Sequence, residues 1–598
     1  MCGIVGYIGK KKVLPILIQG LKKLEYRGYD SAGVAFIVKD HQTKICKSVG
    51  RIAALEKVIP MNEEAFLGIG HTRWATHGGV TKENSHPHQV GDITIVHNGI
   101  LENYLELKNE LMAQGYLFQG DTDTEVACAY MDYLYKKSKS KNMIEILEEC
   151  MKTFIGSYAF AILVQGQSQL FVMKKDSPLI IGLGEDENYV ASDISAYGEK
   201  TSWYIPLEDM EIGIISEHGV QIFQHGQEVH PVKKRVDRKF QDSEKNGFDH
   251  FMLKEIYEQQ HLVEEWSFRY FEQKLLQKLP DIRNYKRIHI IGCGTAYHAG
   301  LVGKYLLEEE NDIEVNVFIA SEYRYQKLFI DPTTLVIAVS QSGETADTLA
   351  SIKRVQKYQV HTLGIVNVPD SSIARCVDEV IYTEAGPEIA VASTKAYTSQ
   401  LFIFGMLALK IHELNDGLNF ASLKKDYQLL GTLLQNLIQF NYQPIVDLLF
   451  DKDNVFYLGR NIDYVTGMEG SLKLKEISYI HSEAMPAGEL KHGTISLMDE
   501  DSCVIVLITK EELASKTISN IKEVHSRGAK VILLATDSLR EKIDPSCYHE
   551  VIWLPKVSPY IQPIVNTIPL QMIAYEVAKK RGLDIDKPRN LAKSVTVE

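Results

Sequence analysis

A cysteine stands directly after the initiator methionine and could act as a nucleophile. Removal of Met1 would leave Cys2 with a free α-amino group, and the reference pKa of such a group is about 7.7–8.0. An amine on the same residue as the thiol can serve as its general base near neutral pH. Because a cysteine at position 2 is usually accidental, its interpretation depends on the other polar motifs of the chain.

The chain carries groups that could stabilise the oxyanion formed when a nucleophile attacks an amide. His97-Asn98-Gly99 follows an expected strand at Ile93–Val96. Asn98 can donate a side-chain N–H, and Gly99 can donate a backbone N–H that a substrate can approach closely. Two such donors suit an oxyanion hole.

Two further residues could hold an amino acid by its charged ends. Arg73 lies in the motif His71–Gly78, which also follows an expected strand, and its planar guanidinium suits an α-carboxylate. Asp123, in Gly120–Glu125, could hold an α-ammonium group. Together with Cys2 and the oxyanion donors, these residues indicate hydrolysis of the amide of an α-amino acid.

Histidines in the same region raise the alternative of a metal site. They stand at positions 71, 77, 86, 88 and 97. His86 and His88 have tight spacing, but no cluster of carboxylates or cysteines accompanies them, so we expect no metal here.

A dense group of polar side chains lies between an expected strand at Thr334–Val339 and a helical pattern at Ala346–Ile352. Unpaired N–H groups and the helix dipole make such a helix start suitable for an anion. Since the segment contains no Lys or Arg, it suits a small phosphate monoester, and an ordinary serine helix cap is the alternative. The candidate ligands are Ser340, Gln341, Ser342 and Thr345.

Nucleotide-binding loops do not fit the sequence. Gly292 and Gly294 would need a third glycine at position 297 for a dinucleotide fingerprint, and that position is Tyr297. No glycine-rich loop ends in Gly-Lys followed by Ser or Thr. The phosphate interpretation therefore concerns a sugar or another small monoester.

A third group of residues could perform acid–base chemistry. Lys473 and Glu476 are three residues apart in the helical pattern Glu469–Glu476, so they share one face of a helix. His492 follows in Gly488–Gly493. By themselves these residues predict only a solvated ion pair worth under about 1 kcal/mol and a structural histidine.

The elements that must position these groups differ between the two halves. Up to about residue 240, short segments rich in β-branched and aromatic residues predict many strands, with helical patterns at Val13–Leu24 and Thr124–Lys136. The polar stretch Lys233–Phe248 contains the expected linker, residues 241–250, and a surface loop within one domain is the alternative. Expected strands include Ala65–Gly70, Ile93–Val96, Tyr158–Val164, Leu170–Lys174 and Glu211–Ile215.

The second half alternates apolar strands with long helical patterns, which indicates parallel sheets with crossover helices. It also repeats itself. Segments Ile288–Gly292, Leu335–Val339 and Thr362–Val366 match segments 167, 168 and 169 positions further on. Three matches in order at a nearly constant offset predict a duplicated α/β domain of about 150 residues. The counterpart of Ser340–Thr345 is Ile508–Leu513, which has lost the hydroxyl cluster, so we expect the second copy to supply chemistry instead of phosphate binding.

Composition excludes several classes. The 598 residues carry a net charge of −13 with no long basic block, which disfavours nucleic-acid binding. The longest apolar run, Leu401–Leu409, is far shorter than the about 20 residues of a membrane span, and the N-terminus does not have the order of a secretory signal. Eight scattered cysteines without a CxxC pair indicate free thiols in a reducing cytoplasm.

The amino-terminal motifs resemble those of the N-terminal-nucleophile glutamine amidotransferases. The matching segments are Met1–Gly6, Glu25–Gly33, His71–Gly78 and His97–Ile100. The resemblance implies a four-layer αββα domain over residues 1–240, in which Cys2 forms a γ-glutamyl thioester and releases ammonia. It also implies that glutamine is bound by Arg73, Thr76, His77, Gly99 and Asp123.

The motifs of the second half resemble tandem sugar-isomerase domains. The matching segments are Cys293–Thr295, Ser340–Thr348, Val391–Ala396, Leu472–His481, Gly488–Gly493 and Pro588–Glu598. Expected boundaries are 251–440 for the first domain with its leading helices, 441–586 for the second and 587–598 for a tail. Some relatives have Ser after Cys-Gly-Thr, where this chain has Ala296, so only Thr295 is kept there as a candidate ligand.

Joined together, the two halves resemble the glucosamine-6-phosphate synthase family over essentially the whole chain. This resemblance implies that D-fructose 6-phosphate and L-glutamine become D-glucosamine 6-phosphate and L-glutamate, the first step of amino-sugar synthesis. It implies a homodimer or larger assembly in the cytoplasm, without redox or metal cofactor. The implied sugar-phosphate ligands are Thr295, Ser340, Gln341, Ser342, Thr345, Val391 and Ser393.

The resemblance also assigns roles to the acid–base group. Glu476 would move a proton between C1 and C2 of the sugar, supported by Lys473, and His492 would assist ring opening. Lys593 would form a Schiff base with the open-chain ketose. Ammonia would travel from Cys2 along a shielded path, with Trp74 as its gate.

Two alternatives stay open at this point. One is another Cys-first glutamine amidotransferase that acts on a different sugar phosphate. The other is a sugar-phosphate sensor with an inactive glutaminase, although such a protein should lack Cys2, Glu476 or Lys593.

Overall fold

The computed structural model describes residues 2–75, 77–198, 200–235, 244–310, 312–416 and 420–596. The chain divides into two compact units, one formed by Met1–Ser243 with Ala592–Glu598 and the other by Glu244–Leu591.

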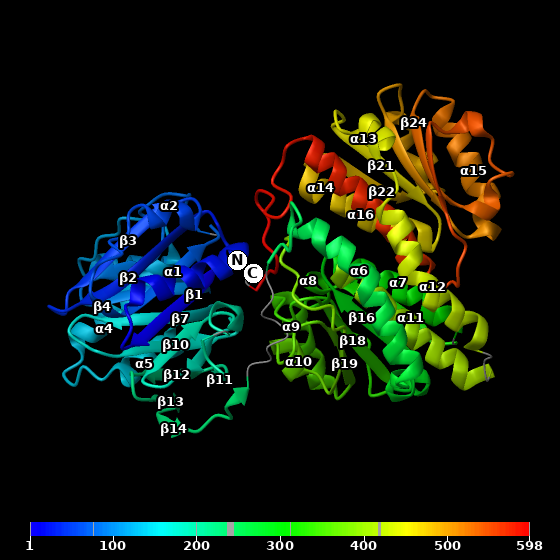
Figure 1. Ribbon diagram of the computed structural model, residues 1–598. Helices are drawn as coiled ribbons and strands as arrows, with labels where there is room; N and C mark the ends of the chain where they lie inside the picture. The colour runs from blue at the N-terminus through cyan, green and yellow to red at the C-terminus, as the bar shows by residue number, and fades with distance from the viewer. Residues whose placement is uncertain are drawn as a thin grey trace. The chain divides into compact units, whose positions relative to one another are not determined.

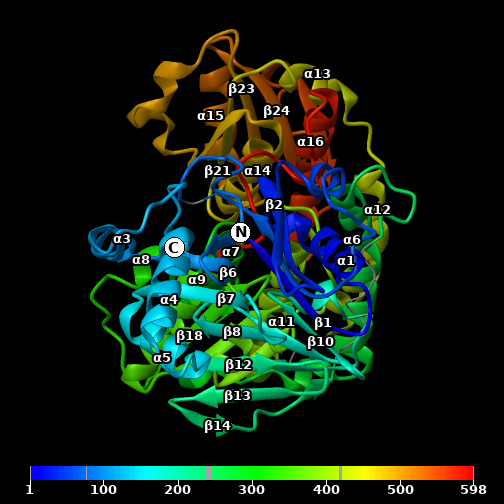
Figure 2. The ribbon, with the colours of Figure 1, turned by 90° about the vertical axis from the view of Figure 1, so that its left-hand side faces the viewer.

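The amino-terminal unit contains two antiparallel sheets packed face to face (Figure 1). The eight-stranded sheet has, in order, β15 (Lys234–Arg235), β11 (Trp203–Pro206), β9 (Ile180–Leu183), β10 (Glu187–Ala191), β1 (Gly3–Gly9), β4 (Ala65–Arg73), β2 (Ser31–Val38) and β3 (Thr43–Val49). The seven-stranded sheet has β14 (Gln227–Val229), β13 (Val220–Gln224), β12 (Glu211–Ile215), β8 (Leu170–Lys175), β7 (Gly156–Val164), β6 (Ile93–Leu101) and β5 (His88–Val90). Figure 2 shows β12, β13 and β14 in succession along one edge.

Helices cover the outer faces of both sheets. Alternate strand residues such as Ile69 and Ala161 fill the core between the sheets, because neighbouring side chains of a strand point to opposite faces. The opposite face of the first sheet packs against α1 (Val13–Leu24), and that of the second against α4 (Asp123–Lys137) and α5 (Met143–Thr153). The expected αββα arrangement is therefore confirmed.

Two details of the sequence analysis were wrong in this unit. The described residues contain more helices than the two expected, since α2 (Ile52–Glu56), α3 (Tyr104–Ala113) and α5 are also helical. Helix α3 buries only two leucines, so its apolar spacing is weak. The motifs beginning at His71 and His97 do not follow strands. Strand β4 continues into the first motif as far as Arg73, and β6 continues through the second. Buried polar residues there hide the usual apolar alternation.

The second unit contains two parallel five-stranded sheets. The first has the order β17 (Glu314–Ile319), β16 (Arg287–Gly292), β18 (Thr334–Ser340), β19 (His361–Val366) and β20 (Glu379–Tyr382). The second has β22 (His481–Pro486), β21 (Asn454–Gly459), β23 (Cys503–Ile508), β24 (Lys530–Thr536) and β25 (Glu550–Leu554). The strands paired by the internal repeat occupy equivalent positions in the two sheets, which confirms the predicted duplication.

Helices lie on both faces of each parallel sheet, as Figure 1 shows for β21 and β24 between α15 and α16. One continuous core joins the inner faces of both sheets to the helices between them. The helices of this unit are α6 (Phe251–Ser267), α7 (Thr295–Glu310), α8 (Ala320–Tyr323), α9 (Ala346–Val355), α10 (Ser372–Cys376), α11 (Lys395–Asp416), α12 (Phe420–Ile438), α13 (Gln443–Leu449), α14 (Ile462–Ser478), α15 (Glu511–His525) and α16 (Gln562–Lys580).

All eight cysteines are free thiols, as the sequence analysis expected. Among the described residues, none of the helices is both long and apolar enough to span a membrane.

Candidate active site

Strand register places Cys2 beside the first predicted motif. Gly3 of β1 pairs with Thr72 of β4, so Cys2 lies next to the end of β4. Its Sγ accepts a hydrogen bond from the backbone N–H of Trp74 at 3.3 Å and lies 3.5 Å from the carbonyl oxygen of the same residue. Burial raises the pKa of the Cys2 thiol, although positive charge and the Trp74 N–H oppose this shift. A thiol that is protonated at neutral pH needs a general base before it can attack.

Asn98 of the other sheet reaches the same place. Its Nδ2 donates to the carbonyl oxygen of Cys2 at 3.1 Å. Its Oδ1 lies 3.1 Å from Nε2 of His71, which also lies 2.9 Å from the carbonyl oxygen of His97. Because both partners of this Nε2 are oxygens that accept, the nitrogen carries a hydrogen and donates. His71 thereby fixes which end of the Asn98 amide faces Cys2.

Gly99 has a backbone conformation that requires glycine. Its φ is +142°, and a Cβ atom there would lie 2.0 Å from the carbonyl oxygen of Ser157 on β7. The absence of a side chain leaves its backbone open to close approach. This geometry supports the predicted oxyanion interaction without testing it.

Asp123 is the first residue of α4 and is buried. Its carboxylate accepts from the backbone N–H groups of Leu101 and Thr124, each at 2.9 Å. The first of these bonds connects it to the end of β6, the strand that carries Asn98 and Gly99. Asp123, the residue predicted to bind glutamine, is therefore held next to the predicted oxyanion donors.

Arg73 has described partners that the sequence analysis did not expect. Its guanidinium donates to the carbonyl oxygens of His77, Gly78 and Gly79, so it holds the loop after β4. His77 lies in that loop, with its ring 5.4 Å from that of Tyr104. Thr76 lies outside the described residues. The binding of glutamine by these residues stays a prediction.

Trp74 is partly buried, and its ring lies 6.3 Å from that of Tyr29 in an edge-on arrangement. Its predicted role as a gate stays a prediction.

In the second unit, Lys473 and Glu476 lie on one face of α14, as predicted, and form an ion pair of 2.6 Å. The pair is not solvated, because the Lys473 side chain is 1% exposed. Lys473 Nζ also lies 3.4 Å from Glu469 and 3.1 Å from the hydroxyl of Thr295. Thr295 in turn donates to Glu469 at 3.1 Å, so the first turn of α7 joins this cluster.

Burial by itself would lower the pKa of Lys473, but the carboxylates of Glu469 and Glu476 outweigh it and raise the pKa. Lys473 is therefore a charged ammonium group at neutral pH. Such a group orients Glu476 and stabilises negative charge beside it, which suits a supporting part in proton transfer.

The predicted phosphate ligands form one loop between β18 and α9. The hydroxyl oxygen of Ser340 accepts from the backbone N–H of Gly343 at 3.0 Å and lies 3.0 Å from the hydroxyl of Thr345. Ser342 accepts from the N–H of Glu344 at 3.1 Å, and Gln341 is partly buried between them. The loop lies at the carboxyl end of the sheet, where ligands bind in open α/β folds.

The other predicted residues of the second half lie in segments outside these two groups. The N–H of Val391 donates to the backbone of Asp586 at 3.0 Å, and Ser393 donates to Glu388 at 2.5 Å. His492 is exposed at the end of a short 3₁₀ helix. Lys593 belongs to the amino-terminal compact unit, so its link to the sugar site stays a prediction.

Sequence reasoning assigned no role in the sites to three buried polar residues, Glu469, His298 and His71. Glu469 accepts from Thr295 and lies 2.8 Å from His298, which is also buried. Glu469 is four residues before Lys473, a spacing that could have identified it. His71 and His298 have no comparable sequence signal, because their partners are distant along the chain.

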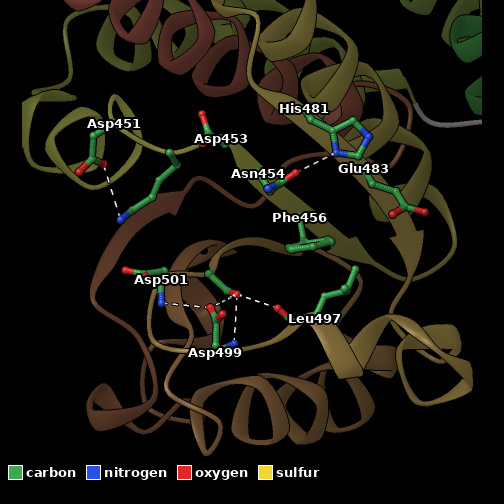
Figure 3. Close-up of a pocket in the computed structure, with 11 residues that line it drawn as sticks. Asp451, Asp453, Asn454, Phe456, His481, Glu483, Leu497, Asp499 and Asp501 are labelled. Atoms are coloured by element: carbon green, nitrogen blue, oxygen red, sulfur yellow. Dashed lines mark hydrogen bonds and ion pairs between the residues drawn. The ribbon is translucent and has the colours of Figure 1, made fainter.

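A cavity of the second unit lies apart from these residues. It has a volume of about 470 Å³ and lies where β21, β22 and β23 begin, at the edge of the sheet opposite the carboxyl ends of its strands (Figure 3). Asp451, Asp453, Asp499 and Asp501 line it together with His481. Within the described part of the chain, no group of His, Cys, Asp and Glu is arranged to hold a metal ion.

The fold and these two groups of residues define a protein with a glutamine amidotransferase domain followed by two SIS domains. Residues 71–198 match the glutamine amidotransferase domain family, and residues 281–410 and 448–580 match the SIS domain family. The glutamine–fructose-6-phosphate aminotransferases (isomerizing) of Clostridium tetani and of Thermus thermophilus are 46% and 43% identical to this chain, with full coverage of both sequences. The chain belongs to this family.

A solved structure of the C-terminal domain of glucosamine-fructose-6-phosphate aminotransferase from Francisella tularensis is also similar. It is 38% identical, covers 58% of this chain and all of its own, and has a TM-score of 0.54.

Proposed function

We propose that this protein converts D-fructose 6-phosphate and L-glutamine to D-glucosamine 6-phosphate and L-glutamate. Membership of the family over the full length of the chain supports this reaction. The observation that carries its first step is the Asn98 amide, which donates to the backbone of Cys2 and is held by His71.

In the first half-reaction, the α-amino group of mature Cys2 takes the thiol proton, and the sulfur attacks the side-chain amide of glutamine. Asn98 and Gly99 stabilise the oxyanion. Arg73, Thr76, His77 and Asp123 bind the amino acid. Ammonia leaves, and water then releases glutamate from the thioester.

In the second half-reaction, loop residues 340–345 hold the phosphate of the sugar, with Thr295, Val391 and Ser393 around it. His492 assists ring opening, and Lys593 forms a Schiff base with the ketose. Glu476 transfers the proton between C1 and C2 next to the charged Lys473. Ammonia reaches the sugar without release into solvent, and Trp74 controls its passage. The protein works in the cytoplasm as a homodimer or larger assembly.

The test is formation of glucosamine 6-phosphate from fructose 6-phosphate by the purified full-length protein, with glutamine as nitrogen donor. Cys2→Ala is expected to abolish the product made with glutamine, and Lys593→Arg to abolish isomerisation. Glutamine-dependent synthesis that continues in Cys2→Ala would remove the glutaminase assignment. Cys46→Ala is a matched control, because Cys46 is a partly buried free thiol on β3.

A further inference from the structure

The duplicated sheets allow a comparison of equivalent positions in the second unit. Gly292 and Gly459 end the equivalent strands β16 and β21. A Cβ atom at Gly292 would lie 3.0 Å from the backbone carbon of Ala296, and one at Gly459 would lie 2.6 Å from that of Asp463. A tyrosine follows in each copy. Ala296 and Asp463 are therefore equivalent second residues of α7 and α14.

Asp463 fills the loop after the next strand of its own sheet. Its carboxylate accepts from the backbone N–H groups of Thr509 at 2.8 Å and Lys510 at 3.4 Å. It also accepts from the hydroxyl of Thr509, which is held in addition by Asn566 of α16. Asp463 is only 3% exposed, so this carboxylate is part of the interior. The loop donors before α15 thus already hold a carboxyl group supplied by the chain.

The equivalent loop of the first sheet has a different partner. It begins at the last residue of β18, as residues 508–513 begin at the last residue of β23, and it carries the hydroxyl groups of Ser340 and Ser342. The equivalent helix presents only the methyl group of Ala296. The side chain of Ala296 is therefore too short to accept hydrogen bonds in this loop as Asp463 does in the equivalent loop.

We infer that the side chain at this one helical position decides which sheet binds sugar phosphate. Asp463 supplies a built-in carboxyl group that closes the second sheet, whereas Ala296 leaves the first sheet open. The chain accordingly binds one sugar phosphate, at the loop Ser340–Thr345. This inference rests on the proposed function for the identity of the sugar, but not for the closure by Asp463.

The first test closes the open loop. Binding of D-fructose 6-phosphate to the full-length protein is measured by titration calorimetry. Wild-type protein is expected to bind one molecule per chain. Ala296→Asp is expected to weaken binding by about 100-fold, because its carboxylate would lie beside the phosphate with like charge. Ala296→Asn introduces a side chain of the same size without the charge. Its affinity for D-fructose 6-phosphate should be at least tenfold higher than that of Ala296→Asp.

The second test opens the closed loop. Asp463→Ala copies the first sheet and frees the backbone N–H groups of Thr509 and Lys510, which the Asp463 carboxylate holds in wild-type protein. Titration with inorganic phosphate, followed by ³¹P NMR, is expected to show one more bound phosphate per chain than in wild-type protein. Asp463→Asn keeps an oxygen on the loop donors and should add none.

Equal affinity of Ala296→Asp and Ala296→Asn for the sugar phosphate would overturn the inference. So would an unchanged phosphate stoichiometry in a folded Asp463→Ala variant. If Asp463→Ala does not fold, the comparison of Ala296→Asp with Ala296→Asn tests the inference. If wild-type protein binds no fructose 6-phosphate, the proposed function fails, and the phosphate titration of the Asp463 variants decides the inference separately.

Discussion

At the scale of single residues, the two reactive centres depend on buried polar groups whose orientation is set by hydrogen bonds and ion pairs. Asn98 presents the N–H end of its amide to Cys2, because the carbonyl oxygen of Cys2 can only accept and because the other end of the amide accepts from His71. Lys473 is charged in the interior only because Glu469 and Glu476 surround it. A buried charge without such partners would cost several kcal/mol. Reactive residues of this protein therefore cannot be separated from the neighbours that orient them.

His71→Leu is expected to lower kcat for glutamine hydrolysis by about 10- to 100-fold with little change in KM, since the released Asn98 amide can turn its oxygen toward the oxyanion. His71→Gln offers an N–H at a similar distance and should recover part of the activity. Steady-state kinetics of glutamate release measures both. A rise in KM at constant kcat, or a Gln variant as poor as the Leu variant, would contradict this positioning role.

At the scale of elements, strand and helix ends determine where the reactive groups stand. Asn98 and Gly99 lie near the end of strand β6. Position 99 requires a glycine, because its φ is positive and its Cα lies close to the backbone of β7. The start of α6 depends in the same way on a distant residue. Asp586 accepts from the backbone N–H groups of Phe251 and Met252, each at 2.9 Å.

Gly99→Ala is expected to destabilise the amino-terminal unit by about 2–4 kcal/mol, because its Cβ would meet the Ser157 carbonyl oxygen in addition to the strained φ. Gly115 also has a positive φ, +88°, but a Cβ atom there would have no neighbour within 4 Å, so Gly115→Ala should cost only about 1 kcal/mol. Urea unfolding compares the two variants. Equal losses would show that the contact with Ser157 can relax.

Asp586→Ala is expected to destabilise the second unit by about 1–2 kcal/mol, because the first N–H groups of α6 lose their acceptors. Asp586→Asn keeps one acceptor oxygen and should lose less. Chemical unfolding monitored by circular dichroism measures the difference. An Ala variant as stable as wild-type protein would show that water replaces the cap without cost.

At the scale of the whole molecule, two units of different chemistry share one chain. One is an antiparallel αββα unit, and the other is a duplicated parallel α/β unit with one continuous core. Buried neutral histidines are concentrated in the first unit, which gives it its own response to acid. Those of the first unit are His71, His86, His88 and His97.

Acid is therefore expected to destabilise the amino-terminal unit. Burial lowers the pKa of all four histidines, to about 3 for His71 and about 4 for His97. Below about pH 6.5 the unfolded chain binds protons that the folded unit does not. Stability is thus complete above that pH and is lost as the pH falls, by about 1.4 kcal/mol per pH unit for each histidine.

Urea unfolding at pH 7, 6 and 5 measures this loss. His71→Gln should reduce the dependence of the free energy of unfolding on pH, because one buried histidine fewer takes up a proton on unfolding. A free energy of unfolding that stays constant between pH 7 and 5 would contradict the prediction.

The sequence determined the class of fold and many of the candidate residues. Buried parallel strands are continuous apolar segments in the sequence. Their order and their duplication could therefore be recognised from matches at offsets of 167 to 169 residues. Lys473 and Glu476 were joined correctly because helical spacing is a local property. The strand ends at His71 and His97 were misplaced because buried polar groups interrupt the apolar alternation.

Only the tertiary structure decided which distant groups meet. His71 and Asn98 come from different sheets, and Thr295 and Glu469 are separated by 174 positions. It also showed that the Asp463 carboxylate occupies the second loop, whereas the sequence indicated only that this loop lacks the cluster of hydroxyl groups found in the first. The physical reason is that such contacts depend on sheet packing and strand register, which no local periodicity encodes.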